Sequence, residues 1–414
     1  MSSFDLVIRD AYLHDRDDVV DIAVDGETIE VVGTVSESGE TEIDADGDLV
    51  SPGLVDCHTH YDWSYSAAGD RRPRGGEVPY DQTVNTKRLR EYMSEATQAD
   101  ARESVISGVE SAVANGVLHG RTHAYVQSDV GTKDVKGVLE ARDALAPTFD
   151  LEIVSFPQEG YLNDEGSADA TREALELGVD LVGGIDPGSV NEEVEGTIDL
   201  WFDLAEEYDV GIDAHLHDPG SLGRFTLGQF AETAVERGFE GRVTGSHVYA
   251  LGDHSRDTAR FPQGDLDYAL GAVSDADMSL ITCYMSTPTE MPIERIHEHG
   301  IDLGHGTDQI QDLWIAHGNA SPLQGAMVES IKLDGEEDYY SNPGMRTIWE
   351  MITTGSAAVL GIEGYGIEEG TPANLVVHDA PSPEWVIIRQ PDCEYVISDG
   401  TVVARDGELT TELA

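Results

Sequence analysis

The chain has 414 residues, of which 81 are acidic and 24 are basic, so its formal net charge is −57. No basic stripe is present, which excludes nucleic acids and anionic membranes as partners. The acidic residues are scattered among the 40% of residues that are hydrophobic, and they predict an acidic surface on a folded core rather than a disordered tail. Such a surface is typical of proteins that work in concentrated salt.

The cysteines and the N-terminus bear on the cellular compartment. Cys57, Cys283 and Cys393 are too few and too far apart for a disulfide framework or a Cys-x-x-Cys zinc site. The first residues, MSSFDLVIRD, lack the basic and apolar regions of a secretory leader, and no run approaches about eighteen apolar residues. We therefore expect a soluble protein in the cytoplasm of a high-salt organism.

Both ends of the chain are rich in short strand candidates separated by turns. Before residue 50 the strand candidates are FDLVIRDAYLH, DIAVDG, TIEVVGTV and DADGDLVSPG, with Asp-Gly pairs that mark tight turns. After residue 370 they are ANLVVHDA, EWVIIRQ, CEYVISDG and TVVARDGEL. This pattern predicts one small β-sandwich domain, built from residues 1–50 together with residues 370–414.

Residues 51–369 alternate apolar strand candidates with amphipathic helix candidates, which is the pattern of parallel βα units. The strand candidates are VDCHTHYD, LHGRTHAYV, DLEIVSFPQEG, VDLVGGIDPG, VGIDAHLHD, EGRVTGSHV, MSLITCYMS and IDLGHGTD. Helices are expected near residues 98–115, 134–146, 167–177, 195–208, 226–238, 257–272, 289–299 and 347–360. Eight such strands close a (β/α)8 TIM barrel, which presents catalytic groups at the carboxyl ends of its strands.

Residues that can bind a metal follow several of these strands. His58 and His60 share one face of the first strand, although the pair alone is equally consistent with a structural or surface role. The fifth strand ends in His215, the sixth in His247 and the eighth in Asp308. Imidazole and carboxylate groups suit Zn²⁺ or Fe²⁺, with one position left open for water. The predicted ligands of one divalent metal ion are His58, His60, His215 and Asp308.

A metal in such a site would make water reactive. It lowers the pKa of a bound water to about 7, and an adjacent carboxylate can then take the proton. Asp308 could both bind the metal and accept this proton, and His247 could steady the hydroxide. The pattern therefore predicts hydrolysis by a metal hydroxide.

The order of these residues resembles the amidohydrolase superfamily, including its flanking β domain. Within it, the segment FPQEG (156–160), preceded by RTH (121–123), and the segment 308–314 are similar to cytosine deaminase. The resemblance spans almost the whole chain and implies the metal-centre roles given above. It further implies that the amide of Gln158 reads the ring carbonyl and NH edge of the substrate, and that Trp314 is an aromatic wall of the pocket.

Many binuclear relatives bridge their metals with a carboxylated lysine at a strand end. The four lysines of this chain are Lys87, Lys133, Lys136 and Lys332, and none of them falls at a predicted strand end. The resemblance therefore implies a site for one metal ion.

Two positions depart from the cytosine deaminase pattern. Three residues after His215 the family carries a glutamate that moves a proton to the ring, whereas this chain has Asp218, with His217 as an extra titratable group. His217 could join the site, or it could be a partly exposed residue at the start of a loop. The family's acidic residue after Asp308, which contacts the substrate amine, is replaced by Gln309. These changes predict a substrate other than cytosine.

Three functions compete. The leading hypothesis is an aminohydrolase, in which metal hydroxide attacks a carbon of a nitrogen heterocycle that bears an amine, and Asp218 or His217 protonates the ring. The alternative is hydrolysis of a cyclic amide or another C–N amide bond, which releases no ammonia. An inactive binding protein is the third, and the complete ligand set argues against it. A homo-oligomer is compatible with the pattern.

The acidic composition leads to a prediction about salt. Dialysis from molar into millimolar KCl should unfold the protein, because repulsion between the surface carboxylates is then no longer screened. Circular dichroism at matched protein concentration measures the change. An unchanged spectrum would contradict the expected dependence on salt.

Overall fold

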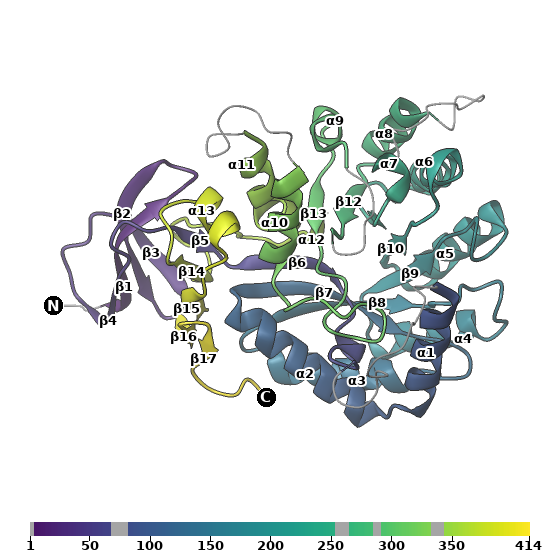
Figure 1. Cartoon of the computed structure of the whole chain (residues 1–414), viewed down its shortest axis with the longest axis horizontal. Helices are drawn as coiled ribbons and strands as arrows, with labels where there is room; N and C mark the ends of the chain where they lie inside the picture. The colour runs from purple at the N-terminus through teal and green to yellow at the C-terminus, as the bar shows by residue number, and fades with distance from the viewer. Residues whose placement is uncertain (1–3, 68–81, 253–264, 285–290, 333–342) are drawn as a thin grey trace.

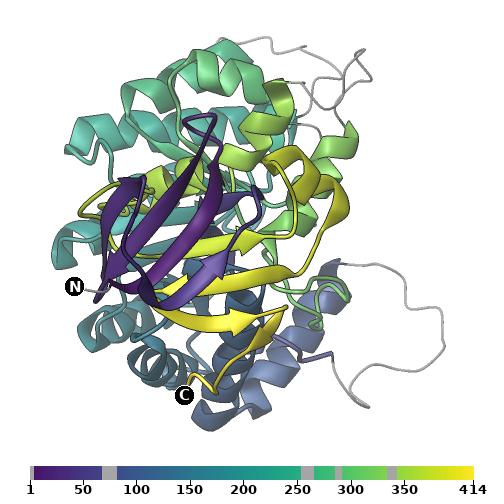
Figure 2. The same ribbon diagram turned by 90° about the vertical axis from the view of Figure 1, so that its left-hand side faces the viewer.

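The computed structural model describes residues 4–67, 82–252, 265–284, 291–332 and 343–414. A barrel of parallel strands surrounded by helices lies beside two sheets built from the two ends of the chain (Figures 1 and 2). This confirms the predicted α/β class, with a (β/α)8 barrel and a small β-sandwich. None of the helices in these residue ranges is long and apolar enough to cross a membrane.

The barrel sheet contains eight strands in chain order. They are β6 (Leu54–Thr59), β7 (Val117–Tyr125), β8 (Asp150–Phe156), β9 (Leu181–Ile185), β10 (Gly211–His215), β11 (Val243–Ser246), β12 (Ser279–Thr282) and β13 (Leu303–His305). Neighbouring strands pair in parallel, and a bridge between Thr59 and Asp308 joins the end of the sheet to its beginning. All eight predicted strands are confirmed.

Helices connect the strands and cover the barrel (Figure 1). They are α1 (Gln82–Glu95), α2 (Gln98–Ala114), α3 (Lys133–Leu145), α4 (Ser167–Leu177), α5 (Val194–Tyr208), α6 (Gly220–Arg237), α7 (Tyr249–Gly252), α8 (Leu266–Asp275), α9 (Ile293–Glu298), α10 (Pro322–Lys332), α11 (Pro343–Glu350) and α12 (Thr354–Leu360). The helix predicted at 347–360 is two helices, because the backbone of Thr353 (φ −134°, ψ −107°) is not helical. The first part of the helix predicted at 257–272 lies outside the described residues.

The first barrel strand shows how the sequence directs its side chains. Val55 and Cys57 of β6 pack on the outside of the barrel, against Ala357 of α12. Because side chains alternate along a strand, His58 and His60 point into the barrel. Burial of Val55 and Cys57 against the helices therefore directs His58 and His60 toward the barrel interior.

The β-sandwich combines both termini (Figure 2). One sheet has the order β3-β2-β1-β4 and the other the order β17-β16-β15-β14-β5. These strands are β1 (Phe4–Leu13), β2 (Asp18–Asp25), β3 (Thr28–Gly33), β4 (Gly39–Asp44), β5 (Val50–Pro52), β14 (Leu375–His378), β15 (Cys393–Ser398), β16 (Thr401–Arg405) and β17 (Glu408–Leu409). Leu6 and Ile22 of the first sheet share one core with Leu375 and Ile397 of the second. The domain boundaries near residues 50 and 370 stay a prediction.

One strand predicted near the C-terminus is wrong. The segment EWVIIRQ (384–390) lies almost entirely within a helix, α13 (Pro383–Arg389). Pro383 takes the first turn, where its missing N–H is not needed, and Val386 and Ile387 are buried on one side of the helix. A short apolar run is consistent with either a strand or a buried helix, so periodicity alone did not distinguish them.

The closure of the barrel leads to a prediction about stability. Gly306 lies so close to β6 that an added Cβ would come 2.5 Å from the carbonyl oxygen of His58. Gly306→Ala should lower the free energy of unfolding of the metal-free protein by about 1–3 kcal/mol, because backbone must move to admit the methyl group. Urea unfolding in constant high salt measures the change.

The matched control is Gly271→Ala in α8, where an added Cβ meets no atom within 4 Å. Alanine favours a helix over glycine by up to about 1 kcal/mol, so this variant should be as stable as the parent or more stable. Equal stabilities of the two variants would show that the close approach at Gly306 does not constrain the fold.

Candidate metal centre

Closure of the barrel brings Asp308 to the first strand. Its N–H donates to the carbonyl oxygen of His58 (2.8 Å), and its carbonyl oxygen accepts from the N–H of His60 (3.1 Å). Just before it, Thr307 donates from its backbone nitrogen (2.9 Å) and its hydroxyl (2.6 Å) to the buried carboxylate of Asp56. These hydrogen bonds hold the first strand and the segment after the eighth in register where the predicted ligands meet.

The predicted ligand atoms lie at distances that suit one metal ion. His60 Nε2 is 3.3 Å from His215 Nε2. Asp308 Oδ1 is 3.5 Å from His60 Nε2 and 3.7 Å from His58 Nε2. Ligands about 2.0–2.1 Å from a tetrahedral zinc ion are about 3.4 Å from one another. His58, His60 and Asp308 thus form one possible metal-binding group, and His215 lies beside it at His60. We call these four side chains the ligand quartet.

The imidazoles of the quartet are in the form that binds metals. Burial lowers the pKa of His58, His60 and His215 well below its ordinary value, so the rings are neutral. Neither ring nitrogen of His58, nor Nδ1 of His215, has a hydrogen-bond partner among the described residues. Neutral rings with available lone pairs beside a carboxylate fit Zn²⁺ or Fe²⁺.

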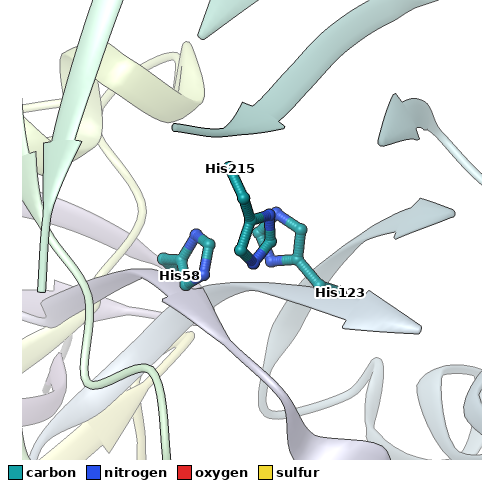
Figure 3. A group of neighbouring side chains, drawn as sticks. All are labelled: His58, His123 and His215. Atoms are coloured by element: carbon teal, nitrogen blue, oxygen red, sulfur yellow. The ribbon is translucent and has the colours of Figure 1, made fainter. Parts of the chain in front are cut away.

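A further histidine belongs to the same cluster. The ring centroid of His123, from β7, lies 4.0 Å from that of His58 and 4.7 Å from that of His215 (Figure 3). The nitrogens of these three residues form one possible metal-binding group, and His58, His247 and Cys283 form another. Both groups share His58 with a third group, which consists of His58, His60 and Asp308.

Neighbouring groups orient the ligands. The ring of His60 stacks on Trp63 with centroids 4.3 Å apart, and the ring of His215 stacks on Phe156 at 4.1 Å. His60 Nδ1 lies 3.2 Å from the carbonyl oxygen of His123, a contact that directs Nε2 of the same ring toward the other ligands. The packing of the barrel therefore sets the ring orientations that a metal requires.

Gln309, a predicted substrate contact, has its amide engaged within the protein. Its Oε1 accepts a hydrogen bond from Trp63 Nε1 (3.0 Å), and its Nε2 donates to Asp308 Oδ1 (3.1 Å). The residue is 5% exposed. In this structure the amide nitrogen of Gln309 is therefore bound to the carboxylate of the quartet, and its amide oxygen is bound to Trp63.

The two candidate proton carriers after β10 differ in orientation. The side chain of His217 is 22% exposed, and its ring centroid lies 4.3 Å from that of His247 and 5.7 Å from that of His215. Asp218 is 3% exposed, and its Oδ2 accepts from the backbone N–H of Ser189 at 3.2 Å. The structure thus brings His217 beside the cluster and directs the carboxylate of Asp218 to the loop after β9.

The remaining predicted substrate contacts are Gln158 and Trp314. Gln158 follows β8 by two residues and is half-buried. Trp314 is half-buried and packs against an apolar cluster that includes Trp63 and Phe156. Trp314 is therefore near the side chains that stack on the ligands, and the roles of both residues toward a substrate stay predictions.

Several residues around the centre have no distinct signal in the sequence. Trp63 resembles an ordinary core aromatic there, and Phe156 belongs to the FPQEG segment, but nothing in the sequence indicates that either ring stacks on a histidine. Asp186 follows β9 and hydrogen-bonds to His217, which lies 31 residues further on. His123 could have been found from its inward-facing position in β7, two residues after Arg121.

Comparison with known proteins places this site in a family. The amidohydrolase family model matches residues 41–404. The N-isopropylammelide isopropyl amidohydrolase of Pseudomonas sp. (strain ADP) is 41% identical over 409 residues, which cover 97% of this chain and 98% of that protein. The chain belongs to the amidohydrolase family and is a hydrolase of carbon–nitrogen bonds, as the resemblance in its sequence implied.

Solved structures agree with this assignment. N-isopropylammelide isopropylaminohydrolase from Burkholderia multivorans superposes with a TM-score of 0.86 at 28% identity, over 98% of this chain and 99% of that one. The 5-methylcytosine deaminase from Klebsiella pneumoniae, liganded with 5-fluorocytosine, has a TM-score of 0.83 at 25% identity, over 96% and 97%. The predicted resemblance to cytosine deaminase is confirmed.

The quartet leads to a prediction about metal content. Protein purified in high salt should carry about one equivalent of zinc or iron, and His215→Ala should lose most of it, because the site then lacks one of its four protein ligands. Elemental analysis after gel filtration measures the metal. The control is His119→Ala, a histidine of β7 whose Nδ1 lies 3.7 Å from Asp150, and it should keep the full content. Parental metal content in His215→Ala would exclude the quartet.

Proposed function

We propose that the protein is a mononuclear metal-dependent aminohydrolase, which releases ammonia or a small alkylamine from an amino-substituted nitrogen heterocycle. One observation supports this above all, namely that the ligand quartet lies beside two further histidines, His247 and His217. Their ring centroids are 4.7 Å from His58 and 5.7 Å from His215, respectively. The site therefore combines ligands for a Lewis acid with groups that can move protons.

The proposed reaction is the hydrolysis of the exocyclic C–N bond that joins a ring carbon to its amine substituent. A bound divalent metal would supply Lewis-acid activation of water near neutral pH. Asp308 accepts one proton of the attacking water, and His247 orients that water. The water oxygen bonds to the ring carbon, and His217 transfers a proton to the ring nitrogen. The proton held by Asp308 passes to the leaving nitrogen as its bond to the ring carbon breaks, and the added hydroxyl returns its proton to His217. The products are a ring carbonyl and the free amine.

The substrate we propose is not cytosine. Gln309 hydrogen-bonds to Asp308 and Trp63, so we assign it to positioning of the carboxylate rather than to recognition of an amine. The amide of Gln158 and the ring of Trp314 remain the proposed contacts to the heterocycle.

Apolar groups around the centre favour a substrate with a small alkyl substituent. Leu89, Met93 and Ile185 form one buried cluster with Phe156, whose ring centroid is 5.1 Å from that of His60. We propose that apolar side chains packed beside these rings favour a small alkyl group on the leaving amine. Two relatives are named after N-isopropylammelide and 5-methylcytosine, and both compounds are nitrogen heterocycles of this broad class.

The setting of this activity is also part of the proposal. We place it in the cytoplasm of a high-salt organism, with a small molecule as partner rather than a nucleic acid or a membrane. Zinc and iron both suit the quartet, and a homo-oligomer is compatible with the fold.

Product analysis tests the proposed reaction. A panel of amino- and alkylamino-substituted pyrimidines and triazines, together with cyclic amides, is incubated with the enzyme in high salt. We expect one equivalent of ammonia or alkylamine per heterocycle consumed, with the ring intact. A product with an opened ring and a new carboxylate would favour the cyclic amidase instead.

Replacement of the Asp308 carboxylate also tests the proposed reaction. Asp308→Ala should lower kcat by at least about 10³-fold, because both a ligand and the proton acceptor are lost. Asp203→Ala in α5, where the side chain of Asp203 is 61% exposed, should turn over normally. Near-normal activity of Asp308→Ala would end the assignment.

A further inference from the structure

Asp186 connects the ends of two neighbouring barrel strands. It directly follows β9, is 2% exposed, and has a positive φ of 24°, which residues other than glycine rarely adopt. Its N–H donates to the carbonyl oxygen of His215 at 3.0 Å. The backbone of Asp186 is therefore anchored to a residue of the ligand quartet.

The carboxylate of Asp186 is directed to His217. Its Oδ2 lies 2.8 Å from His217 Nδ1, and its Oδ1 accepts from the backbone N–H of His217 at 2.5 Å. Oδ1 also accepts from the backbone N–H of Asp218 at 3.1 Å. One carboxylate thus holds both the ring and the backbone of His217, so the ring cannot rotate without breaking its bond to Oδ2.

This contact selects one tautomer of the imidazole. An ionised carboxylate can only accept, so the nitrogen of His217 that faces it, Nδ1, must carry the hydrogen. In the neutral ring the lone pair then lies on Nε2. The ring is partly exposed and lies 4.3 Å, between centroids, from the ring of His247. Nε2 is therefore the nitrogen available for proton exchange.

We propose that Asp186 is a positioning residue, which fixes the Nδ1–H tautomer and the orientation of His217 so that Nε2 exchanges the proton with the substrate. The proposal rests on the proposed function and deepens it. It gives the site a proton carrier other than Asp218, whose Oδ2 accepts from the Ser189 N–H in the loop after β9.

Asp186→Asn tests the proposal with almost no change in shape. The amide oxygen can still accept from the two backbone N–H groups, but the NH₂ group then faces Nδ1 and requires the opposite tautomer, with the hydrogen on Nε2. We expect kcat to fall on the order of 10²–10⁴-fold, with KM within about threefold of the parent value. Metal content and thermal stability should stay close to those of the parent.

The matched control is Asp134→Asn. Asp134 is a fully buried aspartate of α3, and this variant should retain parental kcat. The double variant of Asp186→Asn with His217→Gln should be no slower than His217→Gln alone, because Asp186 acts through that ring. Multiplicative losses in the double variant would overturn the proposal, as would parental kcat in Asp186→Asn or in His217→Gln.

The tautomer itself is measured by long-range ¹⁵N–¹H correlation spectra of the zinc-loaded protein. The His217 signals are assigned by their loss in His217→Gln. At a pH where the ring is neutral, we expect the hydrogen on Nδ1 in the parent. A neutral ring with its hydrogen on Nε2 would overturn the proposal even if Asp186→Asn does not fold. If none of the heterocycles is hydrolysed, the proposed function fails, while the tautomer still tests the role of Asp186.

Discussion

The candidate site depends on two backbone hydrogen bonds that close the barrel. One joins the N–H of Asp308 to the carbonyl oxygen of His58, and the other joins the N–H of His60 to the carbonyl oxygen of Asp308. Asp308 lies almost 250 residues after His58 and His60 in the chain. Without this closure, nothing would hold its carboxylate beside the two histidines. The glycine before this segment, Gly306, permits the close approach because it has no side chain to occupy the space beside His58.

A buried polar layer lies further along the same inward faces. Arg121 is almost fully buried and pairs with Glu152 (2.6 Å) and Asp213 (2.9 Å). Burial opposes the charge on Asp213, yet nearby His123, Arg121 and hydrogen bonds hold its pKa at about 2. Because a charge buried without a partner is costly, these groups are stable only together. Asp213 precedes His215 by two residues in β10, so this strand carries both a residue of the polar layer and a residue of the quartet.

The sequence anticipated most of the architecture, and its errors have physical causes. Eight strands were recognisable because parallel strands buried on both faces form apolar runs. The segment 384–390 was misassigned because a short apolar run does not reveal its period, and only its packing against α10 and α11 shows that it is a helix. The break at Thr353 was missed because its backbone conformation has no sequence signature comparable to proline or glycine.

The sequence by itself determined the class of chemistry, because the residue types of the quartet and their places at strand ends depend only on local spacing. It left open whether His217 or Asp218 carries the proton, and it predicted a substrate contact for Gln309. Only the tertiary structure directs these side chains, since their partners, Asp186, Ser189 and Trp63, lie in other segments of the chain. The choice of candidate ligands follows from local pattern, whereas orientation and tautomer follow from contacts that form only when the barrel closes.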